Sequence, residues 1–109
     1  MMTIDVRLPR GSAAKVVFNS LYADDTSHRT QDVLFVELGN GVFIDVGWYP
    51  ERDPAGSYRI NVYRGQWNNQ LRKPIRTRDP HKVAEQVQKL AVRYEQARRR
   101  VKVVKQSKG

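Results

Sequence analysis

Two β-rich runs, residues 33–38 and 42–49, form the clearest hydrophobic pattern in the chain, and Gly39-Asn40-Gly41 separates them. This arrangement is typical of a β-hairpin. A two-residue turn at Asn40-Gly41 would mix charged and apolar side chains on both faces, whereas a three-residue loop with Gly41 in the left-handed conformation separates them. The three-residue loop is therefore predicted. It gathers one continuous apolar face, made of Leu34, Val36, Leu38, Val42, Ile44, Val46 and Trp48.

Further strands are predicted by shorter alternations. Residues 57–64 alternate with Tyr58, Ile60 and Val62 on the inward side, and residues 3–8 alternate up to Pro9. Residues 71–75 alternate as well, but Pro74 has no amide donor, so a fourth strand of the meander must lie at a sheet edge. Residues 50–56 are rich in turn-forming residues and separate the second and third strands of the meander.

Helical periodicity occurs in two places. Residues 12–22 place apolar side chains on one helical face with Ser12 as N-cap, although the β-branched run at residues 15–18 leaves a strand as the alternative. A long C-terminal helix is predicted to begin at Asp79-Pro80, with Asp79 as N-cap and Pro80 in the first helical position. Its apolar stripe, which should cover the sheet, consists of Val83, Val87, Leu90, Ala91, Tyr94 and Val101.

These elements predict an α+β fold: an antiparallel meander of three to four strands, a long C-terminal helix packed on one face and a short N-terminal helix. The domain is predicted to span residues 1–97, with a basic C-terminal tail at residues 98–109. The order helix, three strands, helix resembles that of the double-stranded RNA-binding domain. That family's basic motif at the start of its last helix is replaced here by residues 79–84, so the sequence indicates no family.

Composition narrows the class of protein. The chain has 109 residues, which suits a single hydrophobic core, and it has no cysteine, so disulfides and thiolate metal sites are excluded. No apolar run approaches the roughly 20 residues of a membrane span, and residues 1–8 lack the pattern of a signal peptide. A cytoplasmic protein without a membrane partner is therefore expected.

Charged residues are distributed unevenly along the chain. Residues 71–109 carry 13 Lys and Arg against 3 Asp and Glu, a net charge of +10, whereas residues 1–70 carry 7 against 8. A near-neutral body with a cationic end predicts a polyanionic partner, of which RNA or DNA is the commonest, and the alternative is a solvated helix face. The residues predicted to contact phosphate are Arg72, Lys73, Arg76, Arg78, Lys82, Lys89, Arg93, Arg98, Arg99, Arg100 and Lys102.

Aromatic side chains suggest a second kind of surface. In the predicted register the outward face of the sheet carries Val33 and several aromatic residues, interleaved with Glu37, Asp45, Arg59 and Asn61. Such a face can stack on bases or bind a protein, or it can lie under the N-terminal helix or a partner chain. Trp67, in a polar loop, either caps the open end of the core or anchors a partner. The residues predicted for a protein interface are Phe35, Phe43, Tyr49, Tyr63 and Trp67.

Nothing in the chain has the spacing of a catalytic site. His28 and His81 are isolated from one another, and neither has a nucleophile or carboxylate at a suitable spacing. The acidic pairs at residues 24–25 and 51–53 do not match a calcium loop, so no metal or cofactor is expected. The sequence thus predicts a small non-catalytic basic protein that binds RNA or DNA through its C-terminal helix and tail. The alternative is a protein-interaction module, such as an adaptor, an inhibitor or a homodimer subunit.

Overall fold

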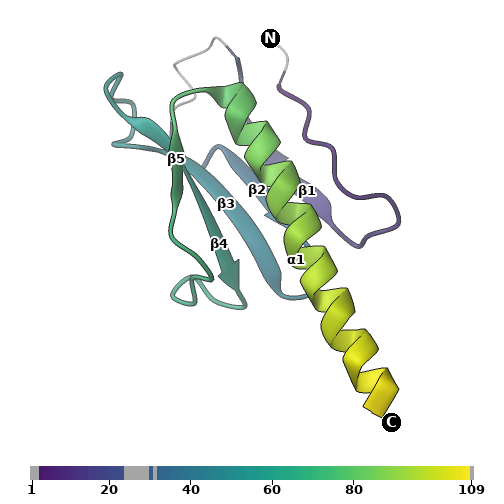
Figure 1. Cartoon of the computed structure of the whole chain (residues 1–109). Coiled ribbons are helices and arrows are strands. Elements are labelled where there is room, and N and C mark those ends of the chain that lie inside the picture. The colour runs from purple at the N-terminus through teal and green to yellow at the C-terminus, as the bar shows by residue number, and fades with distance from the viewer. Residues whose placement is uncertain (1–2, 24–29, 31, 109) are drawn as a thin grey trace.

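The computed structural model describes residues 3–23, 30 and 32–108, with side chains up to Glu95, and it is an α+β fold with one antiparallel five-stranded sheet (Figure 1). Each strand pairs with the one before it, in the order β1-β2-β3-β4-β5. The predicted meander is therefore present, with more strands than the three to four expected. The elements are β1 (Lys15–Asn19), β2 (Leu34–Glu37), β3 (Val42–Tyr49), β4 (Ser57–Arg64), β5 (Ile75–Thr77) and α1 (Pro80–Lys108).

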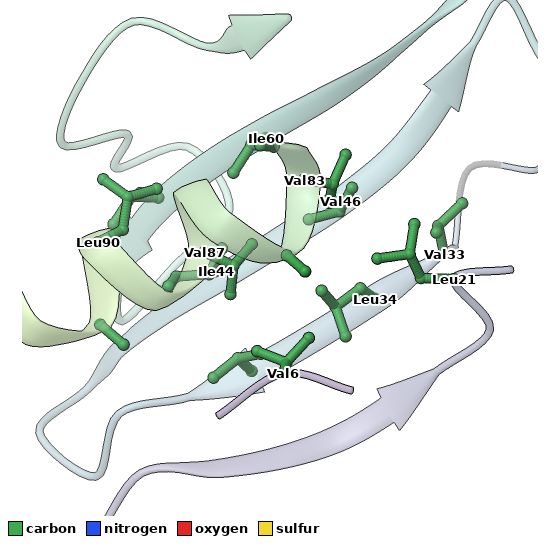
Figure 2. Close-up of a cluster of buried hydrophobic side chains, with 14 of the residues drawn as sticks. Val6, Leu21, Val33, Leu34, Ile44, Val46, Ile60, Val83, Val87 and Leu90 are labelled. Carbon is green, nitrogen blue, oxygen red and sulfur yellow. The ribbon is translucent and has the colours of Figure 1, made fainter. Parts of the chain in front are cut away.

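The hydrophobic core lies between α1 and one face of the sheet, which we call the inner face (Figure 2). Val83, Val87 and Leu90 of the helix pack against residues of β2, β3 and β4 such as Ile44 and Ile60. Trp48 is fully buried and its indole nitrogen donates a 2.7 Å hydrogen bond to the Asp53 carbonyl, so the turn after β3 is tied to the core. The apolar face predicted from the sequence is this inner face.

The β2–β3 hairpin has the predicted three-residue loop. Val36 pairs with Ile44, and the amide of Leu38 donates to the carbonyl of Val42 at 2.9 Å. Gly41 has a φ of +83°, in the left-handed region that favours glycine. Gly39 also has a positive φ, and a Cβ at this position would collide with Ala13, so the loop needs both glycines. The predicted register is confirmed.

The C-terminal helix begins as predicted. The Asp79 carboxylate accepts a 2.9 Å hydrogen bond from the amide of His81, and Pro80 is the first helical residue. The helical backbone continues to Lys108, across the predicted boundary between the domain and the tail at residue 97. Among the described residues, no helix has the length and apolar character that crossing a membrane requires.

The predicted N-terminal helix at residues 12–22 is wrong, and the alternative strand is present as β1. Lys15 pairs with Glu37 and Phe18 with Phe35, with an irregularity in register between Val16 and Phe18. The backbone edge of β2 needs hydrogen-bond partners, and β1 supplies them. Ser12 does not cap a helix: its hydroxyl donates to the Pro9 carbonyl at 2.8 Å within a turn.

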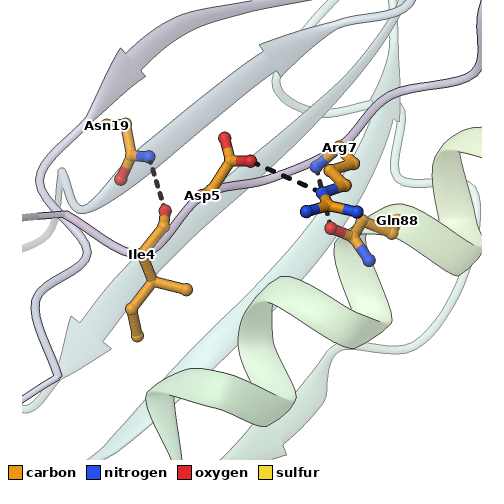
Figure 3. Close-up of polar contacts among 5 residues, drawn as sticks. All are labelled: Ile4, Asp5, Arg7, Asn19 and Gln88. Carbon is orange, nitrogen blue, oxygen red and sulfur yellow. Dashed lines mark hydrogen bonds and ion pairs between the residues drawn. The ribbon is translucent and has the colours of Figure 1, made fainter.

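The predicted strand at residues 3–8 is also not formed, except for an isolated bridge between Thr3 and Tyr22. The stretch instead passes beside α1 (Figure 3), and its Val6 is buried in the core (Figure 2). The amide of Arg7 donates to Oε1 of Gln88 at 2.8 Å, and the Asn19 side chain donates to the Ile4 carbonyl at 3.0 Å. The alternation indicated that Val6 is buried, but the backbone of this stretch bonds to Leu21, Asn19 and Gln88 at separate points rather than along a ladder.

Candidate binding surface

The outer face of the sheet, opposite α1, carries a cluster of four aromatic side chains that we call the aromatic face: Phe35, Phe43, Tyr63 and Trp67. The rings of Phe43 and Tyr63 are stacked with centroids 5.3 Å apart, and the Phe35 ring lies 5.4 Å from Phe43. Trp67 contacts all three, with centroid distances of 4.9 Å to Phe43, 5.4 Å to Tyr63 and 6.0 Å to Phe35. Four residues from β2, β3, β4 and a loop thus form one surface.

Strand alternation and a tight loop build this cluster. Phe43 pairs with Tyr63 in the β3–β4 register, so both rings leave the sheet on the same side. After β4 the chain turns sharply, and the amide of Arg64 bonds to the Asn69 carbonyl at 3.0 Å. An isolated bridge joins Tyr63 to Gln70. The loop therefore returns along β4 and holds Trp67 over the outer face.

Trp67 is 61% exposed although its ring contacts three others. It does not cap the open end of the core, which was one of the two expectations for it. Tyr49, the remaining predicted interface residue, lies apart from the cluster, with the Arg59 guanidinium 4.8 Å from its ring centroid. Val33 was expected on the outer face and is buried in the core at 1% exposure. Its amide donates to the carbonyl of Val46, the residue that pairs with Leu34, so Val33 and Leu34 share one partner and both side chains are buried.

Two apolar residues of the outer surface were missed by the sequence analysis. Val17 and Phe18 of β1 are 52% and 47% exposed, and both line a pocket beside Trp67. They were expected on the apolar face of a helix, because residues 12–22 were predicted to be helical. The β-branched run at residues 15–18, which favoured a strand, was the signal for their position.

Asp45 lies in the middle of this outer surface and is only 9% exposed. Burial, and then the negative charge of Asp32, raise the pKa of Asp45 from 3.8 to about 6. Among the residues that the structure describes, no side chain donates a hydrogen bond to its carboxylate or forms an ion pair with it. Burial and the Asp45 charge also raise the pKa of Tyr63, against a smaller opposing effect of Arg59. At Tyr63 the negative charge of Asp45 thus outweighs the positive charge of Arg59.

The residues predicted to contact phosphate are not gathered on one side of the molecule. Arg76 lies opposite Arg59 in the β4–β5 register. Its side chain is on the outer face, because those of its neighbours Ile75 and Thr77 point inward. Lys82 and Arg93 are exposed on α1, which covers the inner face. The sheet thus separates Arg76 from the cations of the helix.

The other predicted phosphate contacts have varied surroundings. Arg78 donates to the Pro54 carbonyl at 2.7 Å, and Arg72 donates through Nε to the Lys73 carbonyl at 3.1 Å. Lys89 forms a 3.1 Å ion pair with Glu85 one helical turn away. The side chains of Arg98, Arg99, Arg100 and Lys102 lie outside the described residues, although their backbone belongs to α1.

The described residues include no group of three or more His, Asp or Glu side chains that could hold a metal ion. His81 is exposed in the first turn of α1, and its amide bonds to the helix cap. His28, and the acidic pair at residues 24–25, lie outside the described residues. The outer face therefore offers aromatic rings, the carboxylates of Asp32, Asp45 and Glu37, and the guanidinium groups of Arg59 and Arg76.

Comparison of this chain with protein-family models, with curated proteins and with solved structures finds no match.

Proposed function

We propose that this chain is a non-catalytic binding module that holds a partner polypeptide on its aromatic face. The observation that carries the proposal is Trp67, which is held over Phe35, Phe43 and Tyr63 and is still 61% exposed. Tryptophan and tyrosine are enriched among the residues that dominate the affinity of protein interfaces. A pre-formed aromatic cluster also binds at a low entropic cost, since its rings are already fixed by one another.

The charges on the same surface favour a polypeptide over a nucleic acid. Sheet-based nucleic-acid binders combine stacked aromatic rings with a cationic groove that follows the phosphates. Here the aromatic face is bordered by Asp32, Asp45 and Glu37, and the exposed Lys15 is paired with Glu37 at 3.7 Å. Phosphates approaching these rings would meet carboxylates, which repel them. A protein backbone carries no such charge.

Peptide display on the whole chain tests this function. Random dodecapeptides selected on the immobilised protein should include binders that lose at least tenfold in affinity on Trp67→Ala and on Phe43→Ala, measured by fluorescence anisotropy. Val92→Ala is the matched control, because Val92 is an apolar residue of α1 that is 41% exposed. The affinity of this variant for the selected peptides should stay within twofold of that of the unaltered chain. Failure to recover peptides, or equal losses in all three variants, would contradict the proposal.

Light scattering on the same variants measures the oligomeric state, and so distinguishes a partner that is a second copy of the chain from one that is a different polypeptide. A dimer that resists high salt and dissociates in Trp67→Ala would make the second copy the partner. A monomer at all concentrations, combined with peptide binding, would leave a foreign polypeptide.

A second candidate function is binding of RNA or DNA by the C-terminal part of the chain. The observation that favours it is the net charge of +10 over residues 71–109, together with the exposure of Lys82 and Arg93 on α1. Cations on a helix can neutralise phosphates without any contact to the aromatic face. Each neutralised phosphate releases counterions, so binding of this kind weakens steeply with salt.

Titration of labelled RNA and DNA at several salt concentrations tests the second candidate. The double variant Lys82→Glu/Arg93→Glu should weaken binding and lower the slope of log affinity against log salt by about 2. Arg10→Glu/Arg64→Glu changes the net charge equally at exposed positions away from the helix, and it should leave the slope unchanged. Binding that does not depend on salt would rule this function out.

A further inference from the structure

A pocket of about 380 Å³ lies on the outer surface between Trp67 and β1, and its walls are apolar. They come from Val17 and Phe18 of β1, from Leu34 and Phe35 of β2 and from Trp67. This volume falls within the range of about 300–1,000 Å³ that is typical of small-ligand sites. A side chain of a partner that lies along the aromatic face could therefore enter it.

Among the residues that the structure describes, the polar side chains that line the pocket are two carboxylates, Asp32 and Asp45. Asp32 is exposed at the rim, whereas Asp45 lies in the central strand β3 and is 9% exposed. Arg59, a cation on the neighbouring strand β4, lies against the Tyr49 ring. Because the pKa of Asp45 is about 6, most of this carboxyl group is ionised at pH 7.5. The pocket therefore combines apolar walls with a charged group that is largely removed from water.

We propose that this pocket accepts a basic side chain, arginine or lysine, from the partner polypeptide of the function proposed above, on which this inference rests. The methylene stem of the side chain packs against Phe18, Phe35 and Trp67, as long basic side chains commonly do on apolar surface. Its charged head pairs with Asp45 and Asp32. The same outer face already shows the compatible contact within the chain, where the guanidinium of Arg59 lies over the ring of Tyr49.

Other occupants fit the pocket less well. An apolar side chain would remove water from Asp45 without replacing it, which leaves a buried charge unpaired. A phosphate or carboxylate would be repelled by both aspartates. A metal ion would find two carboxylates and otherwise apolar walls, too few ligands for a hard cation. A basic side chain is the one common polypeptide group that satisfies both the apolar walls and the charge.

Nuclear magnetic resonance on the isotopically labelled full chain tests the proposal. The probes are the N-acetyl, N-methylamide derivatives of arginine, lysine and norleucine, of which norleucine has a similar stem without the charge. At pH 7.5 and low salt, the arginine and lysine probes should shift the Trp67 indole resonance and the amide resonances of Phe35 and Asp45 in a saturable way. The norleucine probe should bind at least fivefold more weakly.

Substitutions decide whether the carboxylates are responsible. Asp45→Asn should weaken the basic probes at least fivefold, and Asp32→Asn, at an exposed position outside the strands, should weaken them two- to threefold. Glu51→Gln removes an exposed carboxylate elsewhere and should change nothing. Equal binding of the norleucine probe, unchanged binding in both aspartate variants, or no shift with any probe would overturn the inference.

The outcomes separate this inference from the proposed function. If selected dodecapeptides lose affinity on Trp67→Ala but not on Asp45→Asn, the chain is a binding module and the pocket does not take a basic group. If no peptide is sensitive to Trp67→Ala while the basic probes bind the pocket, the aromatic face is not the interface. Sensitivity to both substitutions supports the two proposals together.

Discussion

Trp48 and Trp67 lie on opposite faces of the same sheet, and their surroundings are opposite as well. Trp48 is fully buried on the inner face, in contact with Tyr58 at 4.8 Å between ring centroids, and its indole nitrogen has a hydrogen-bond acceptor. Trp67 has three ring contacts on the outer face and remains 61% exposed. The inner face has α1 over it, whereas the segment found over the outer face, in the part of the chain that the structure describes, is the short loop after β4.

This difference indicates that the two faces of the sheet contribute differently to stability. The inner face holds the helix and the N-terminal stretch on the sheet, so changes there should cost stability. The outer face contributes less to folding and even contains a charge that opposes it, at Asp45. Substitutions of the same residue type on the two faces should therefore have effects of different size, and in one case of opposite sign.

The largest effect is expected from the two tryptophans. Trp48→Ala removes a fully buried ring and should lower the free energy of unfolding by about 3–5 kcal/mol. Trp67→Ala removes a mostly exposed ring and should lower it by about 1 kcal/mol, mainly from the lost ring contacts. Urea unfolding followed by circular dichroism measures both. Equal losses would mean that the outer aromatic cluster is a second core rather than a surface.

Asp45→Asn should raise the free energy of unfolding rather than lower it. Its pKa is raised from 3.8 to about 6, so the native chain keeps this proton at a pH where the unfolded chain has released it. The free energy of unfolding therefore falls as the pH rises from about 4 to about 6, and the loss persists above that. At pH 7.5 the substitution should raise the free energy of unfolding by about 1–3 kcal/mol.

Urea titrations of both proteins between pH 4 and pH 8 check this sign. The difference in free energy of unfolding between Asp45→Asn and the unaltered chain should be small at pH 4 and grow up to about pH 6. Glu51→Gln, at an exposed carboxylate, should follow the unaltered chain at every pH. A difference that does not vary with pH would show that the charge of Asp45 is not the cause.

An intermediate effect is expected where α1 begins. Asp79→Ala removes the acceptor of the 2.9 Å bond from the amide of His81 and should lower the free energy of unfolding by about 1 kcal/mol. Asp79→Asn keeps an acceptor and should recover most of the loss. Peptide binding to the aromatic face should be the same in both variants, because the cap serves the inner face. A change in peptide affinity would mean that the two faces are coupled through the sheet.

The smallest effect is expected on the solvent side of the helix. Lys89→Ala breaks the 3.1 Å ion pair with Glu85 and should change the free energy of unfolding by less than about 0.5 kcal/mol. High salt should abolish the remaining difference. A larger loss would indicate that the solvent side of α1 packs against another part of the chain.

Local signals allowed much of the inner face to be predicted from the sequence. The loop glycines and the apolar alternation specify the β2–β3 hairpin within about a dozen residues, and Asp79-Pro80 specifies the start of α1. Residues 12–22 were mispredicted because their periodicity suits a helix when they are considered alone. Their state depends on the free edge of β2, and Lys15 reaches Glu37 there only after the chain has folded.

The outer surface was predictable only in part, for a related reason. Alternation placed Phe35, Phe43 and Tyr63 on one side of the sheet, and the structure brings them together. The pocket beside Asp45 depends on Phe18 and Trp67, which line it from two segments remote in the chain. The spacing of residues within one segment cannot predict that three segments come together in the fold.

The hydrogen bond from the amide of Arg7 to Gln88 joins residues 81 positions apart, whereas every strand of the sheet pairs with the strand just before it. Closing a long loop costs more chain entropy than closing a short one, so hairpins can form early and this contact has to wait for α1. During synthesis on the ribosome, the N-terminal stretch would emerge well before its binding site exists. Residues 3–8 are thus synthesised before the sheet and are expected to settle into place after it.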